Sequence, residues 1–411
     1  MGHRALGATM SLSLLALATA VAFAGYSRTY PRWWEAAISL AVLSGIFPMI
    51  LAVNTRIVPV FSRRNWASPS LVRLMVVCAL TGGRLVFGGR IYDQKAAIVI
   101  GSGFSLAAGL LFLANLGQLF RQKPMRPGPP LPFPEQVVAD RIAIGFTRLS
   151  AGWLLVGLTI GFVTAIHTPE MGRWELVWAH AMLVGFAFSM ATGVTYHVLP
   201  RWTNGRWRSI RALKVHFYVT VVALPLMVLA LAIDSQVLFH MAAPLQAAVI
   251  ALWIGNCLPF IRKLPRMTAI GVGAAALALA FGIALGMDFA VTPVNGALLR
   301  PVHAELNLFG WAAVLITGVT YYFAPRFAGA PLRWSQLAPV QLGLTIGGLA
   351  VSIVLVWLRI EGHDAGELVG IAHLASAFGL ALMGVMVAGT FASKPRPLAV
   401  PLQMMKPPVI R

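Results

Sequence analysis

Long apolar stretches alternate with short polar connections along the whole chain. A bilayer is crossed by a helix of about 20 mostly apolar residues. Twelve stretches meet this length: 5–25, 34–55, 69–89, 96–120, 141–166, 174–199, 212–233, 237–261, 267–287, 300–325, 336–358 and 366–392. The connections leave little length for a soluble domain, so the pattern predicts an all-α integral membrane protein with twelve transmembrane helices in one membrane domain, 1–411.

Two segments lie outside the predicted spans. Residues 121–140 contain the run R-Q-K-P-M-R-P-G-P-P, and proline cannot continue a helix because it lacks the backbone N–H. We expect a proline-rich cytoplasmic linker at 121–140 and a cytoplasmic tail at 395–411. The end of the first span, A-F-A-G, resembles a weak signal-peptide cleavage site, but we expect this span to remain as a helix.

Composition and charge agree with a membrane protein. The chain is 58% apolar and 11% charged, whereas soluble domains average roughly 45–50% and about 25%. With the amino terminus inside, the inner connections and tail carry 23 of the 32 Lys and Arg, and the outer connections carry 8. This distribution follows the positive-inside rule and predicts that both termini are cytoplasmic. The net charge of +20 is therefore an orientation signal, and we expect the lipid bilayer, not nucleic acid, as partner.

An internal repeat is visible in the predicted second, sixth and tenth spans. Three segments align, with a proline at the same place in each: 52–61 (A-V-N-T-R-I-V-P-V-F), 193–202 (G-V-T-Y-H-V-L-P-R-W) and 318–327 (G-V-T-Y-Y-F-A-P-R-F). Pro59, Pro200 and Pro325 follow one another at offsets of 141 and 125 residues, and we expect each to end its helix at the cytoplasmic face. The spacing predicts three parallel four-helix repeats in a pseudo-threefold bundle, at about 1–122, 141–263 and 266–394.

Few ionisable residues enter the predicted spans, which makes those few informative. His180, His303 and Glu305 lie near the outer ends of the sixth and tenth spans, where Ser39 occupies the equivalent place in the second. A histidine inside a membrane is costly unless paired, and imidazole is a common ligand of metals and heme. We expect His180 and His303 to bind a cofactor or metal, with His240 and His373 as weaker candidates. Glu305 could be a metal ligand, a proton acceptor or a buried partner of His303.

The sequence lacks the motifs of several other metal-binding and catalytic sites. Cys78 and Cys257 lie in different spans without a C-x-x-C pair, which excludes a zinc ribbon or covalent heme attachment. The sequence also has no phosphate-binding G-x-x-x-x-G-K-[ST], no H-E-x-x-H and no nucleophile elbow.

Residues 178–205, which include W-A-H-A-M-L-V-G-F and T-G-V-T-Y-H-V-L-P-R-W-T-N-G, resemble a signature of the NnrS family. The segment T-R-I-V-P-V-F-S at 55–62 is similar to a second element of that family. The resemblance implies a twelve-span protein of the bacterial inner membrane that contains heme and copper and takes part in the nitric oxide response. That family usually has Glu after the motif histidine, where this chain has Ala181.

A wider resemblance is to subunit I of the heme-copper oxidases. H-A-E-L-N-L-F-G-W at 303–311 is similar to its tenth-helix motif, with His303 at the high-spin heme position and Glu305 at the low-spin one. His180 then matches one copper ligand. The resemblance implies a heme-copper oxidase subunit I-like bundle with heme b and copper as cofactors.

The departures from the oxidase pattern keep several functions open. The seventh span lacks the adjacent His-His pair of the copper site, and the second span has no histidine for a low-spin heme. We therefore expect an NnrS-like metalloprotein that acts in nitric oxide handling or metal handling, with nitric oxide or dioxygen as small ligand. The alternatives are an oxidase-like or nitric oxide reductase-like catalytic subunit, a cation- or proton-coupled transporter, and a component of a respiratory-chain complex.

Overall fold

The computed structural model describes residues 2–27, 32–125, 131–167 and 172–393. In these residues twelve helical spans are long and apolar enough to cross a membrane, as predicted. The predicted tail at 395–411 and the middle of the predicted linker, 126–130, lie outside the described residues. Nine spans are single α-helices: α1 (His3–Gly25), α4 (Pro69–Ile91), α5 (Lys95–Arg121), α6 (Gln136–His167), α9 (Ile210–Ile233), α10 (Gln236–Ile261), α11 (Arg266–Val291), α14 (Ala338–Ile360) and α15 (Gly366–Ala392).

The other three spans are each built from three segments, an α-helix, a π-helix and a second α-helix. They are α2 (Arg32–Leu40), η1 (Ala41–Ile46) and α3 (Phe47–Ser62); α7 (Gly172–His180), η2 (Ala181–Phe188) and α8 (Ser189–Thr203); and α12 (Pro293–Glu305), η3 (Leu306–Ala313) and α13 (Val314–Ala328). These are the second, sixth and tenth spans. Their π-segments start at closely corresponding positions of the three repeats, and such wide turns are frequent at functional sites.

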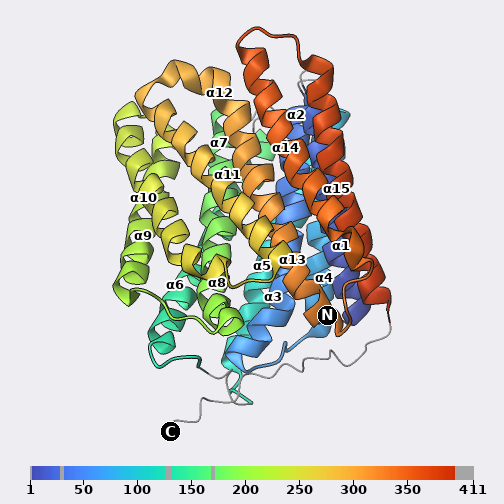
Figure 1. Ribbon diagram of the computed structural model, residues 1–411, viewed down its shortest axis with the longest axis vertical. Helices are drawn as coiled ribbons and strands as arrows, with labels where there is room; N and C mark the ends of the chain where they lie inside the picture. Colours follow the sequence, from blue (N-terminus) through green and yellow to red (C-terminus); the bar gives the residue numbers. More distant parts are fainter. Residues whose placement is uncertain (1, 28–31, 126–130, 168–171, 394–411) are drawn as a thin grey trace.

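The single-helix spans pack against one another in a ring, in which the last span contacts the first. Within the repeats α4 packs on α5, α9 on α10 and α14 on α15, and between them α5 packs on α6, α10 on α11 and α15 on α1. In Figure 1 the segments α2, α7 and α12 lie toward the upper end of the bundle, and α3, α8 and α13 lie toward the lower end. The ring of His3 lies 5.0 Å from that of Phe391, so the two ends of the described chain meet at the lower end.

The expectation that the repeated prolines end their helices is wrong. Each proline lies inside the last turn, and the helices continue to Ser62, Thr203 and Ala328. Proline inside a membrane helix is tolerated when neighbouring groups satisfy the freed backbone. The helices end instead at left-handed residues, Arg63, Asn204 and Gly329, again at offsets of 141 and 125.

The predicted linker is also shorter than 121–140, because α6 already begins at Gln136. Its first residues are bonded to the turn between α3 and α4. The Met125 amide donates to the Arg63 carbonyl at 2.9 Å, and Arg64 Nε donates to the Gln122 carbonyl at 2.7 Å.

Close helix packing in the bundle depends on glycine. A Cβ added at Gly318 on α13 would lie 3.0 Å from backbone atoms of Gly271 on α11, so the two backbones almost touch. Small residues permit this approach, and the dispersion contacts between backbones stabilise helix pairs in lipid.

Candidate metal site

The structure brings His180 and His303 together. His180 is the last residue of α7, and His303 lies near the end of α12, on the next repeat. The centres of the two rings are 6.3 Å apart and the ring planes differ by 19°. Both side chains are half-buried at the same end of the bundle. Two imidazoles from different repeats thus lie next to each other.

Both imidazoles are held by backbone carbonyl groups. His180 Nδ1 lies 2.8 Å from the Leu176 carbonyl oxygen on its own helix, and His303 Nδ1 lies 2.8 Å from the Gly282 carbonyl oxygen on α11. A carbonyl oxygen only accepts, so each Nδ1 carries the proton and each neutral ring keeps a lone pair on Nε2. Metal-binding histidines show this arrangement, in which a backbone acceptor fixes the tautomer and the ring orientation.

Two glycines on α11 make room for this arrangement. A Cβ at Gly286 would lie 3.1 Å from His303 Cε1, and a Cβ at Gly282 would lie 2.5 Å from the Asn307 side-chain amide. Asn307 Nδ2 in turn donates to the His303 carbonyl oxygen at 2.7 Å. The glycines let α11 approach closely enough for the Gly282 carbonyl to reach the ring.

Glu305 pairs with His373 on α15 rather than with His303. Its Oε1 lies 3.4 Å from His373 Nε2, and the two side chains are 4% and 0% exposed. His373 Nδ1 donates to the Val369 carbonyl oxygen at 2.8 Å, so its Nε2 is the nitrogen that faces the carboxylate. The pair joins the second and fourth spans of the third repeat, next to His303 but separate from the His180–His303 pair.

The remaining candidate, His240, is exposed on α10. Among the described residues, no group of three or more His, Cys, Asp and Glu side chains could hold a metal ion. In this part of the chain the site therefore offers two imidazoles as protein ligands, and no carboxylate or thiol completes a group of three.

The structure contains two polar clusters that the sequence does not predict. Arg90 on α4 lies 2.9 Å from Glu35 on α2 and 3.4 Å from Glu175 on α7, and therefore joins the first two repeats at the His180 end. At the opposite end, Asp140 on α6 accepts hydrogen bonds from His197 and Arg201 on α8. Partners in both clusters are 55 to 85 residues apart in sequence, so no local motif marks them.

The Tyr196 hydroxyl forms a third buried contact, 2.6 Å from His216 Nδ1 on α9. Asn256 Nδ2 on α10 donates to the same hydroxyl at 2.8 Å, and this leaves Tyr196 free to donate to His216. His216 thus belongs to a local network away from His180.

A search with models of known protein families and a search of curated protein sequences both find no match. Among solved structures the chain is similar to a heme-copper terminal oxidase, determined by cryo-EM as a dimer. The TM-score is 0.67 at 10% sequence identity, and the match covers 95% of this chain and 84% of the oxidase chain. The fold is therefore like that of a heme-copper terminal oxidase chain, which agrees with the fold that the sequence resemblance implies.

Proposed function

We propose that the protein is a membrane metalloprotein that holds one metal centre between His180 and His303, with heme b as the group that suits the site best. Two imidazoles that share one metal place their ring centres at most about 6.5 Å apart, because each metal–nitrogen bond is about 2.0–2.1 Å long and the ring centre lies about 1.1 Å behind the nitrogen. The observed 6.3 Å and the two unprotonated Nε2 atoms support this assignment.

The number of ligands favours heme. The porphyrin supplies four nitrogens to iron, so two histidines complete the coordination without further protein ligands. Heme held by these two residues would supply one-electron redox chemistry and affinity for nitric oxide or dioxygen. Copper(I) also accepts two imidazoles, and it is the alternative that metal analysis must distinguish.

The same geometry disfavours oxidase-like catalysis. An oxidase of this fold needs a histidine in the second span and an adjacent His-His pair in the seventh, and this chain has neither. The one histidine of that span, His216, is bonded to Tyr196. A group held by His180 and His303 alone would suit electron transfer, gas sensing or metal handling better than turnover. This agrees with the role in the nitric oxide response that the NnrS resemblance implies.

The test is the optical spectrum of the protein purified from heme-replete bacterial membranes. We expect a Soret band that is lost or strongly shifted in His180→Ala and in His303→Ala, but kept in His240→Ala, which removes an exposed histidine. A colourless protein with one copper per chain would assign the site to copper. A colourless, metal-free protein would refute the proposal.

A further inference from the structure

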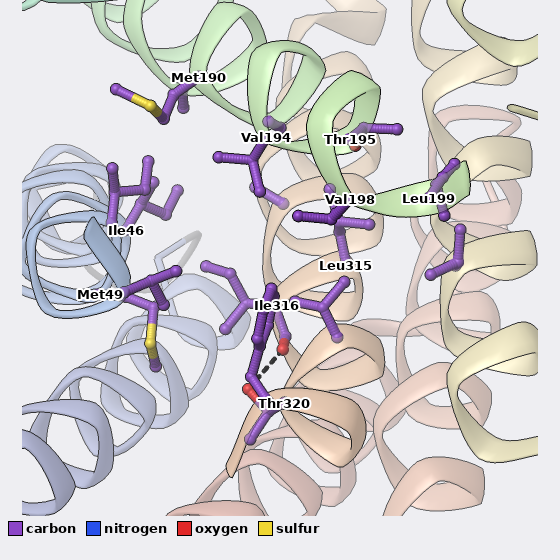
Figure 2. A pocket seen from close by; sticks show the side chains of 18 of the residues that line it. Ile46, Met49, Met190, Val194, Thr195, Val198, Leu199, Leu315, Ile316 and Thr320 are labelled. Carbon is purple, nitrogen blue, oxygen red and sulfur yellow. Dashed lines mark hydrogen bonds between the residues drawn. The ribbon is translucent and has the colours of Figure 1, made fainter. Parts of the chain in front are cut away.

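A cavity of about 140 Å³ lies between the second, sixth and tenth spans. It lies among η1 and α3, η2 and α8, and η3 and α13, with contributions from α10 and α11. Figure 2 shows Ile46 and Met49 on one side, Met190, Val194 and Val198 on the second, and Leu315 and Ile316 on the third.

The lining follows the internal repeat. Five sets of three lining residues are related by the offsets of 141 and 125: Ile46, Ala187 and Ala312; Met49, Met190 and Leu315; Ile50, Ala191 and Ile316; Val53, Val194 and Val319; Asn54, Thr195 and Thr320. Equivalent positions of all three repeats therefore surround the same space. We call it the axial cavity, because it lies where the pseudo-threefold axis must pass.

The axial cavity presents an almost entirely apolar wall. Two polar side chains in the last set are bonded to their own helices: Asn54 Nδ2 donates to the Ile50 carbonyl oxygen at 2.9 Å, and Thr320 Oγ1 donates to the Ile316 carbonyl oxygen at 2.6 Å (Figure 2 shows the latter). The indole N–H groups of Trp253 and Trp311 lack an acceptor among the described residues. The other polar groups of the wall are the Thr195 hydroxyl, the Trp202 indole and the Cys257 thiol. A buried water needs two to four polar partners, so this wall favours an apolar occupant.

The size of the cavity limits that occupant. Apolar protein cavities of about 150 Å³ stay dry and take up xenon or benzene. We propose that the axial cavity is a binding site for a small apolar molecule, such as a dissolved gas, at most about the size of benzene. The site is separate from the metal site, because Ala187 at its near end is seven residues, or about 10 Å along the helix, beyond His180.

One of the small lining residues offers a matched variant. The second repeat has Ala191 where the first has Ile50 and the third has Ile316. Ala191→Ile restores the residue of the other two repeats and fills the cavity from the α8 side. Ala251→Ile is the control, because Ala251 is exposed on the outer face of α10.

The experiment is anomalous diffraction from crystals of the full chain under xenon pressure, with xenon as the probe. We expect a xenon peak inside the axial cavity in the wild type and in Ala251→Ile, and its loss in Ala191→Ile. The midpoint of thermal unfolding of Ala191→Ile should match or exceed that of the wild type, since filling a cavity restores contacts. The peak does not depend on a bound metal, so His180→Ala should keep it.

Several results would overturn the proposal. One is the absence of xenon from the wild-type cavity, with or without an ordered water between Trp253 and Trp311. A second is an acyl chain or detergent tail already present in the cavity. A third is a xenon peak that persists in a folded Ala191→Ile variant.

Discussion

Breaking the buried Glu305–His373 pair should strongly destabilise the third repeat. Both side chains are almost fully buried, and His373 Nε2 lies 3.4 Å from the carboxylate. Removing one partner of a buried pair costs about 3–5 kcal/mol, because the other group stays buried without compensation. For His373→Ala we therefore expect the folded-to-unfolded ratio to fall by roughly a hundredfold to several thousandfold.

Further variants separate the pair from simple loss of packing. Glu305→Gln keeps a hydrogen-bonding group opposite His373, and we expect it to cost only about 1 kcal/mol. The double variant Glu305→Leu with His373→Leu replaces both polar groups, and we expect it to be more stable than His373→Ala.

The assay is reversible unfolding of the purified protein in lipid bicelles by steric trapping, with His240→Ala as the exposed control. The reasoning is refuted if His373→Ala costs no more than His240→Ala. It is also refuted if a double-mutant cycle between positions 305 and 373 gives no coupling.

Three other predictions follow from contacts and charges. Arg90→Ala should cost about 2–4 kcal/mol of unfolding free energy in the same assay, because it leaves Glu175 unpaired in a largely buried site. Arg32→Ala breaks only the exposed pair with Asp93 and should cost less than about 1 kcal/mol. Equal losses in the two arginine variants would contradict this. Gly318→Ala should lower the unfolding free energy by about 1–3 kcal/mol, because the added methyl group overpacks against Gly271. Gly273→Ala is the control and should be near neutral, because the space around its Cβ is open. A neutral Gly318→Ala would show that the two helices can separate. The charge distribution predicts that Asp364 lies on the outer side and Arg262 on the cytoplasmic side. In intact cells a membrane-impermeant maleimide should therefore label Asp364→Cys but not Arg262→Cys, and the native Cys78 and Cys257 should not react because they are buried. The reverse labelling would contradict the orientation predicted from charge.

Hydrophobicity alone predicts the twelve spans, because the bilayer requires about 20 apolar residues in each one. The repeat also indicates that His180 and His303 lie on equivalent inner helices, and their approach follows from this placement. The π-segments have no comparable signal, because a wide turn leaves the hydrophobic pattern of a short segment almost unchanged.

Long-range partners are the part that sequence does not predict. Glu305 precedes His373 by 68 residues and two helix connections, so only the packed bundle shows that they face each other. The repeated prolines also give a wrong prediction of where their helices end. The residue that ends each helix is the left-handed one four positions later, and only Gly329 among the three is a glycine.

The central claim is that one metal centre is held between the imidazoles of His180 and His303. Electron paramagnetic resonance of the oxidised wild-type protein, combined with heme and copper analysis, tests it most directly. We predict one heme per chain with a low-spin, six-coordinate iron signal that is lost or becomes high-spin in His180→Ala and in His303→Ala. A protein without heme or copper, or a low-spin heme signal unchanged in both variants, would contradict the claim.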